Sequence, residues 1–562
     1  MGPRGDCNSR ARGEPSCYPA PMRILAGLLL AGALWAQNRA PEIESIKRDE
    51  MKADLFFLAS DEMRGRLTNT PEYRLAAEWI LSRFRRLGLA PAGEAGEYTQ
   101  EFELVYGRLG EGNRLSVGPR DARRAARLRD EFSPVLPSAN GEVRAQAVFV
   151  GFGVTAPEWN WDDYRGADVK GKIVIVLEGD PREEDPKSVF EGLVTSEYAS
   201  AWRKIMIAQE HGAAGVLLAP GDGPGGRKRS FATLAGGDWP SKPPRIERYD
   251  LASRVNQVRI PALRIAEPLA AQILGQPLAP LRETANRLGG AALASGREEV
   301  DMAAAVTRTT IVERNLLAKI VGSGTQRKDE AVIISAHHDH DGADESQVLN
   351  GADDNGSGTV ALLDIAEAYA AAARGGKRPE RTVIFALWGS EERGLLGSYA
   401  WLQHPLWPLD KTVAALNMDM IGRSEEVPEN GGRRFFGLKP QTAAANANSV
   451  HIMGYSFTPA LAAVVKQANR EIDLTLRLDY DNTRSNLVRR SDQWPFLKGN
   501  VPALFFHTGL HPDYHRMGDR PEKIEYAKME RIARLVYQTS WDLANAAGRP
   551  GMAVPRVIPP EP

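Results

Sequence analysis

The stretch AVIISAHHDH, residues 331–340, joins a continuous apolar run to a cluster of histidine and aspartate side chains. A short apolar run of this kind is typical of a strand buried on both faces of a sheet. Similar runs occur at LLAKIV (316–321), TVIFALW (382–388), VAALNM (413–418) and VPALFF (501–506), and helical patterns such as 359–373 separate them. This alternation predicts an α/β fold with a mostly parallel central sheet flanked by helices.

Polar side chains that can bind metals follow these strands directly. They are His337, His338, Asp339 and His340; Glu391 and Glu392; Asp419; and His507, His511 and His515. Taken singly, each group has an ordinary interpretation, because acidic residues often cap helices and a lone histidine is often structural. Ligands of open α/β sheets bind at the carboxyl ends of the strands, so groups on successive strand ends indicate one shared site.

The segment GADDNGSG, residues 351–358, precedes the expected helix and allows three interpretations. It is a solvated helix cap, a calcium loop, or the source of a catalytic metal ligand. A calcium loop would start at Asp353 and end at Asp364 as its twelfth residue. A glutamate is expected there, an entering helix is missing, and Asp364 falls inside the next helix, so this alternative is disfavoured.

A pair of metal ions accounts for all the groups together. Two cations roughly 3.5–4 Å apart need one bridging carboxylate, and each needs a histidine and a further carboxylate. The sequence supplies one aspartate of the 353/354 pair, histidines from separate segments, Asp419 and one glutamate of the 391/392 pair. The other glutamate would lie beside the metals, where a general base is needed.

The motifs SAHHDH, NGADDNGSG, LWGSEERGLLGS, LNMDM and HPDYHRMGD occur in this order. Through them the chain resembles the secreted di-zinc aminopeptidases of the bacterial leucyl aminopeptidase type, a family that also includes glutamate carboxypeptidase-like enzymes. The resemblance covers about residues 45–545. It implies a metal-dependent hydrolase that removes N-terminal residues from peptides with two Zn²⁺ ions.

The resemblance also assigns roles to individual residues. His337 and Asp419 would complete one zinc site, Glu392 and His515 the other, and Asp354 would bridge both. Glu391 would be the general base, and Asp339 would orient His337. A cis peptide bond is expected between Asp354 and Asn355. His340 is a companion in its motif and no ligand in the family, and Gln493 replaces a histidine that often follows Ser-Asp there.

A second, weaker resemblance lies in the middle of the chain. The stretches VFVGFGVTAP, DDYRGADVKGKIVIV and AQEHGAAGVLL are similar to a protease-associated domain inserted into the catalytic fold. We therefore expect the catalytic domain in two parts, 42–135 and 305–548, the β-rich insert at 140–300, and a disordered tail at 549–562.

The first residues indicate export. MRILAGLLLAGALWA, residues 22–36, has the charged start, apolar centre and small final residue of a signal peptide, and it is too short to cross a membrane. Met22 is then the expected start, residues 1–21 an over-long gene prediction, and cleavage near Ala36 would release the protein outside the cytoplasm. Both cysteines, Cys7 and Cys17, lie in the excluded segment, which leaves metal binding to His, Asp and Glu.

The bulk composition is that of a globular protein. The 562 residues carry a net charge of -1, which gives no reason to expect a nucleic-acid partner or a membrane surface. Peptides are therefore the expected partners. A carboxypeptidase or dipeptidase on the same metals is the main alternative. A single-zinc glutaminyl cyclase-like enzyme and a non-catalytic binding protein are further alternatives, which the complete donor set disfavours.

Overall fold

The computed structural model describes residues 39–553, except 120, 184, 186–187, 191–195, 222–230 and 288–292. The expected signal peptide, the excluded start and the tail beyond 553 therefore lie outside the described residues. Within them, no helix is long and apolar enough to cross a lipid bilayer.

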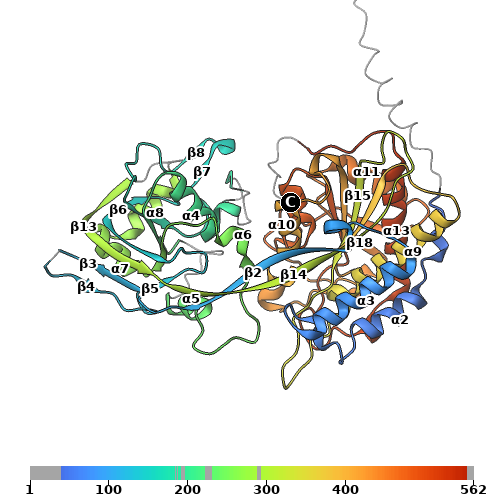
Figure 1. Ribbon diagram of the computed structural model, residues 1–562, viewed down its shortest axis with the longest axis horizontal. Coiled ribbons are helices and arrows are strands. Elements are labelled where there is room, and N and C mark those ends of the chain that lie inside the picture. The colour runs from blue at the N-terminus through green and yellow to red at the C-terminus, as the bar shows by residue number, and fades with distance from the viewer. Residues whose placement is uncertain are drawn as a thin grey trace, which may run out of the picture. The chain divides into compact units, whose positions relative to one another are not determined.

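A ten-stranded mixed sheet forms the part of the fold that carries the polar clusters (Figure 1). Its strands, in spatial order, are β11 (Asp250–Leu251), β2 (Thr99–Leu109), β14 (Val306–Ile320), β16 (Thr382–Trp388), β15 (Ala331–His337), β17 (Thr412–Met418), β20 (Ala503–His507), β18 (Ser449–Met453) and β19 (Thr475–Arg477), and β1 (Ala90–Pro91) pairs with β14.

The parallel part of this sheet is its centre. Strands β16, β15, β17 and β20 run parallel, whereas β2 and β14 pair antiparallel to their neighbours. Strand β18 is antiparallel to β20 and parallel to β19. The sheet is therefore α/β as expected, but less parallel than the apolar runs suggested. The run at 316–321 forms the end of β14, which is antiparallel because a continuous apolar run reports burial and carries no information on strand direction.

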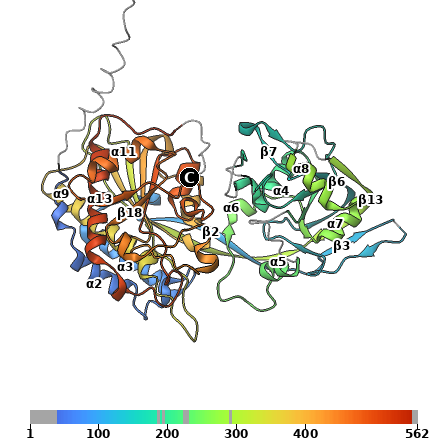
Figure 2. The ribbon, with the colours of Figure 1, turned by 180° about the vertical axis from the view of Figure 1, so that it is seen from behind.

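Helices cover both faces of the central strands. Ile333 of β15 packs in one core cluster with Trp401 of α10 and Phe496 of α12. Since neighbouring side chains of a strand alternate between faces, Val332 and Ile334 point the other way. There α9 and α13 contact β15, and α2 and α3 pack against α9 (Figures 1 and 2). The helices are α2 (Arg48–Leu58), α3 (Pro71–Leu87), α9 (Gly358–Arg374), α10 (Leu396–Gln403), α11 (Pro459–Ala468), α12 (Gln493–Lys498) and α13 (Tyr526–Asn545).

Helix ends follow the sequence signals. The Thr70 hydroxyl accepts a hydrogen bond from the Tyr73 amide and so caps α3, with Pro71 in its first turn. Gly88 ends the same helix with φ 71°, as expected of a glycine that adopts the left-handed conformation.

A second, eight-stranded sheet is built from the middle of the chain. Its strands, in spatial order, are β4 (Arg124–Ala125), β3 (Arg114–Val117), β13 (Leu293–Ala304), β6 (Gly141–Val150), β9 (Ile173–Leu177), β10 (Gly215–Ala219), β12 (Ala262–Ile265) and β5 (Phe132–Pro134). A short pair, β7 (Thr155–Ala156) and β8 (Trp161–Asp162), stands apart, and the helices here are α4 (Ala201–Glu210), α5 (Phe231–Asp238), α7 (Glu267–Leu274) and α8 (Leu278–Arg287). Helix α6 (Ala252–Val255) contacts β2 and β11 of the first sheet.

The limits of the second sheet differ from those expected for the insert. Strands at 114–134 belong to it, so it begins well before residue 140. Within the expected insert, β11 returns to the first sheet and pairs with β2. The stretch before β11 thus connects the two sheets, and its residues form part of the cavity considered below.

Candidate metal centre

The carboxyl ends of three parallel strands bring the expected ligands together. His337 ends β15, Glu391 and Glu392 follow β16, and Asp419 follows β17. Asp354 joins them from the loop before α9. All these side chains are buried: the side chain of Asp354 is 5% exposed, and that of His337 is fully covered.

Asp354 stands between two histidines. Its Oδ1 lies 3.5 Å from His337 Nε2, and its Oδ2 lies 3.0 Å from His515 Nε2. His337 Nε2 also lies 3.5 Å from Asp419 Oδ2, and His515 Nε2 lies 3.5 Å from Glu392 Oε2. One carboxylate thus separates two sets of donors, each of which contains a histidine and a further carboxylate.

Glu391 lies on the His337 side, with Oε2 3.6 Å from His337 Nε2. Its donor atom groups with those of His337 and Asp419 within a span of 4.8 Å. The distances therefore place Glu391 as close to this cluster as the expected ligands. They do not by themselves separate a ligand from a base.

Asp339 organises the strand ends. Its two carboxylate oxygens accept hydrogen bonds from the backbone amides of Glu391 (2.9 Å) and Glu392 (3.2 Å). The same carboxylate lies 3.6 Å from Nδ1 of His337. Asp339 is thus placed to fix both the glutamate loop and the imidazole, and the pKa of Asp339 is lowered by the nearby histidines despite its burial.

The charge balance of the cluster favours cations. Burial, and then repulsion from Glu392, Asp492 and Asp419, raises the pKa of Glu391 well above its usual range. Burial alone would lower the pKa of His337, but the carboxylates of Glu391 and Asp419 hold it well above the ordinary value. His337 Nε2 has no hydrogen-bond partner among the described residues. Buried carboxylates around an unpartnered imidazole nitrogen suit a divalent metal ion.

The loop at 351–358 is shaped by its own polar groups. The peptide bond between Asp354 and Asn355 is cis, as expected from the family resemblance. The Asp519 carboxylate accepts the amides of Asp353 (2.9 Å) and Asp354 (3.0 Å). Gly351 has φ 58°, and a Cβ there would overlap the Asp354 carbonyl and the His340 ring, so only glycine fits.

The two aspartates of the pair have separate environments. Asp353 Oδ1 accepts the amide of Gly422 at 2.6 Å, and Asp353 Oδ2 lies 3.2 Å from His511 Nε2. Asp364 lies within α9, far along the helix from the loop. The arrangement differs from a calcium loop. The Asp353 carboxylate contacts Gly422 and His511, and Asp364 contributes nothing to the turn.

Two residues beside the centre were not anticipated in these positions. Asp341 Oδ2 lies 2.9 Å from His515 Nδ1, and His340 Nδ1 lies 2.8 Å from Glu392 Oε1. Both join donor groups that fit a metal ion. Asp341 directly follows the HHDH cluster in the sequence, and this position is the feature from which its place in the site could be predicted. Gln493 instead supports the core, donating to the Val488 carbonyl at 2.6 Å.

A cavity of about 260 Å³ opens at this cluster. We call it the metal-side cavity; its lining includes Asp354, Glu391, Glu392, Asp419, Leu487, Arg489, Arg490, Phe505, His507, Tyr514 and His515. Its lining combines candidate metal ligands with aromatic, aliphatic and basic side chains. The site is thus a concave pocket that can hold a small polar group against buried carboxylates and histidines.

The fold and site together define an α/β protein with a candidate metal centre at the carboxyl ends of its central strands. Comparison with known proteins shows which protein family and which relatives this chain is similar to. Residues 315–540 match the model of peptidase family M28, and this segment includes every candidate ligand.

Curated relatives include two plant proteins. The probable glutamate carboxypeptidase VP8 of Zea mays is 29% identical over 63% of this chain and 48% of its own length. The probable glutamate carboxypeptidase AMP1 of Arabidopsis thaliana is 29% identical over 68% of this chain and 51% of its own length. The chain therefore spans about half the length of these relatives.

Solved structures that this chain matches include an aminopeptidase from Aneurinibacillus sp. strain AM-1. It is 19% identical, with a TM-score of 0.48, and the match covers 92% of this chain and 97% of that one. The zinc aminopeptidase BSAP from Bacillus subtilis is 18% identical, with a TM-score of 0.42, and the match covers 88% and 95% of the two chains.

Proposed function

We propose that this protein is a zinc-dependent exopeptidase that removes N-terminal residues from peptides. The observation that carries the proposal is the position of Asp354, whose two carboxylate oxygens face two different histidines. Such a carboxylate suits a bridge between two cations. His337 and Asp419 would hold one ion with Asp354, and Glu392 and His515 would hold the other.

When bound, zinc would polarise the scissile carbonyl and make a nearby water more acidic. Glu391 is the group we assign as general base. Its carboxylate would accept a proton from the attacking water and deliver it to the leaving amine nitrogen as the C–N bond breaks. Asp339 would hold the Glu391 amide and orient His337, so it acts as a positioning residue.

The proposal is tested with short peptides that carry a free or a blocked N-terminus, with and without a chelator. We expect release of the first residue from free-amine peptides, loss of this activity on chelation, and recovery on addition of zinc. Turnover that survives complete removal of metal would contradict the metal assignment. The Glu391→Gln substitution tests the general base separately.

A carboxypeptidase on the same centre is the second candidate. It is favoured by Arg489 and Arg490, which line the metal-side cavity and suit a carboxylate ligand, and by the names of the plant relatives. In the same assay, a carboxypeptidase would release the last residue from N-blocked peptides. An aminopeptidase would leave them intact.

We also propose that the second sheet is an inserted protease-associated domain and that residues 22–36 direct export. The support is the sequence similarity of 140–300 and the signal-like composition of the N-terminal segment. Expression of the full chain with its own start should yield an exported protein whose N-terminal sequence begins close after Ala36. Retention of the intact start in the cytoplasm would contradict the export proposal.

A further inference from the structure

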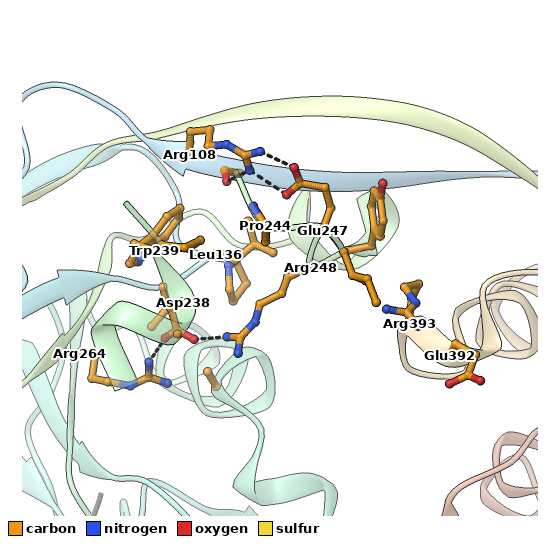
Figure 3. A pocket seen from close by; sticks show the side chains of 18 residues that line it. Arg108, Leu136, Asp238, Trp239, Pro244, Glu247, Arg248, Arg264, Glu392 and Arg393 are labelled. Carbon is orange, nitrogen blue, oxygen red and sulfur yellow. Dashed lines mark hydrogen bonds and ion pairs between the residues drawn. The ribbon is translucent and has the colours of Figure 1, made fainter. Parts of the chain in front are cut away.

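A second cavity adjoins the candidate active site. It has a volume of about 560 Å³, within the range of ligand pockets, and we call it the outer cavity (Figure 3). Glu392 lines both cavities, and Arg393, the next residue, lines the outer one. Glu392 therefore lies at the border between the metal-side cavity and the outer cavity.

The walls of the outer cavity are mainly apolar and aromatic. They include Leu136, Pro137, Trp239, Pro244, Ile246 and Tyr249. Trp239 is fixed by a hydrogen bond from its indole N–H to the Pro134 carbonyl at 2.7 Å. These side chains come from segments of the chain that nothing in the catalytic proposal uses.

Apart from Glu392, the charged side chains that line this cavity are paired with opposite charges. Figure 3 shows Asp238 between Arg248 and Arg264, with Arg108 paired to Glu247 on the opposite side. Arg393 pairs with Asp341 outside this set. Guanidinium groups that already have carboxylate partners gain little from an ionic ligand. The cavity is therefore suited to an uncharged, apolar group.

The wall at 244–249 is attached to the catalytic sheet. Strand β11, which follows it directly, pairs with β2, and the Arg254 guanidinium lies 4.3 Å over the ring of Tyr399 in α10. Arg245 donates a hydrogen bond to the carbonyl of Asp341, whose carboxylate contacts His515. These contacts hold the wall beside the candidate centre.

We propose that the outer cavity binds the part of a peptide substrate that lies beyond the scissile bond and selects apolar or aromatic side chains there. This inference rests on the proposed exopeptidase function. The metal-side cavity, at about 260 Å³, would take the single residue that is released. The remaining chain would pass Glu392 and place its next side chains against Ile246 and Trp239.

The test compares three free-amine substrates with wild-type and Ile246→Asp protein. These are an aminoacyl anilide, which is too short to reach the outer cavity, and two pentapeptides with Phe or Ser at the third and fourth positions. Wild type should cleave the Phe peptide with about tenfold higher kcat/KM than the Ser peptide, in line with the burial of one or two apolar side chains. Ile246→Asp should lose at least fivefold of this preference and leave anilide turnover unchanged.

Two variants serve as controls. Ile246→Val keeps an apolar side chain and should retain most of the preference. Val312→Asp adds the same charge at a residue that is 54% exposed and lines neither cavity, and it should change nothing. Equal loss with all three substrates in Ile246→Asp, or no preference in wild type, would overturn the inference.

Binding separates this inference from the proposed function. A fluorescent Phe pentapeptide with a reduced first peptide bond cannot be hydrolysed, and its dissociation constant can be measured by anisotropy. We expect weaker binding to Ile246→Asp than to wild type, by fivefold or more. Such a difference without any turnover would refute the exopeptidase proposal alone, whereas turnover without this difference would refute the outer-cavity proposal alone.

Discussion

The carboxylate of Glu391 carries the proposed proton transfer, and a conservative substitution isolates it. Glu391→Gln keeps the size of the side chain but removes its ability to accept a proton. We expect metal content to remain near the wild-type value while kcat falls by about 10²–10⁴. Both quantities are measured on the same zinc-loaded preparation, and turnover close to wild type would show that another group is the base.

Asp339 is expected to act through its neighbours. Asp339→Asn keeps one acceptor for the amides of Glu391 and Glu392 but lacks the negative charge beside His337. We predict zinc affinity about 10–100-fold weaker, as for other groups that orient metal-binding histidines. A competition titration with a chromogenic chelator measures this, and unchanged affinity would remove the positioning role.

For single residues, the sequence predicts which side chains lie at the strand ends. It predicts less well which other side chains they contact. His337, Asp354, Glu391, Glu392, Asp419 and His515 were all expected at one centre, and the structure brings them together. The contacts of Asp341 and Asp519 were not expected. Both are set by loop conformation, which joins residues more than 150 positions apart and leaves no local pattern.

Helix α9 contains a buried acid that should make stability depend on pH. Asp364 is 4% exposed, and neither of its oxygens has a hydrogen-bond partner among the described residues. Burial, then repulsion from Asp54 and Glu50, raises the pKa of Asp364 to about 8, although Arg83 opposes the shift. The folded state therefore keeps this proton through a range in which the unfolded chain has released it.

The sign of the effect follows from linkage. Because the folded protein binds more protons than the unfolded chain between about pH 4 and pH 8, this group lowers stability as the pH rises through that range. Asp364→Asn should be more stable than wild type at pH 8 by roughly 2–4 kcal/mol, with the difference vanishing towards pH 4. Asp49→Asn, at a side chain that is 91% exposed, is the control for urea unfolding at each pH.

Helix α3 offers a test of local structure. Thr70→Ala removes the cap of the Tyr73 amide and should lower the free energy of unfolding by about 1 kcal/mol. Ser82→Ala, an interior position of the same helix, should stay within roughly 0.5 kcal/mol of wild type. Equal effects of the two substitutions in urea titrations would show that the cap contributes nothing.

Helices and strands are predicted best where a regular sequence pattern coincides with burial in the structure. The strands at 331–337, 382–388 and 412–418 and the helix at 358–374 match the expected ranges closely, since each has a strong periodic or apolar signal. The direction of the strands and the limits of the second sheet are harder to predict from the sequence. β14 and the strands at 114–134 obtain their partners from distant segments, which local composition does not encode.

For the whole molecule, the proposed centre predicts that bound metal stabilises the fold. Ligands from separate loops and strands come together only in the native state, so ions that bind there should raise the unfolding temperature. Chelation should lower Tm, and zinc should restore it. Asp364→Asn should show the same metal-dependent shift as wild type, and an unchanged Tm on chelation would contradict binding at this centre.

The proposed function requires that Asp354 joins two metal ions in one site. Metal analysis of zinc-loaded, desalted protein tests it most directly. We expect two zinc ions per chain in wild type, about one in His515→Ala and close to none in Asp354→Ala, with Asp364→Asn unchanged at two. A single ion per chain in wild type, or two ions retained by Asp354→Ala, would contradict it.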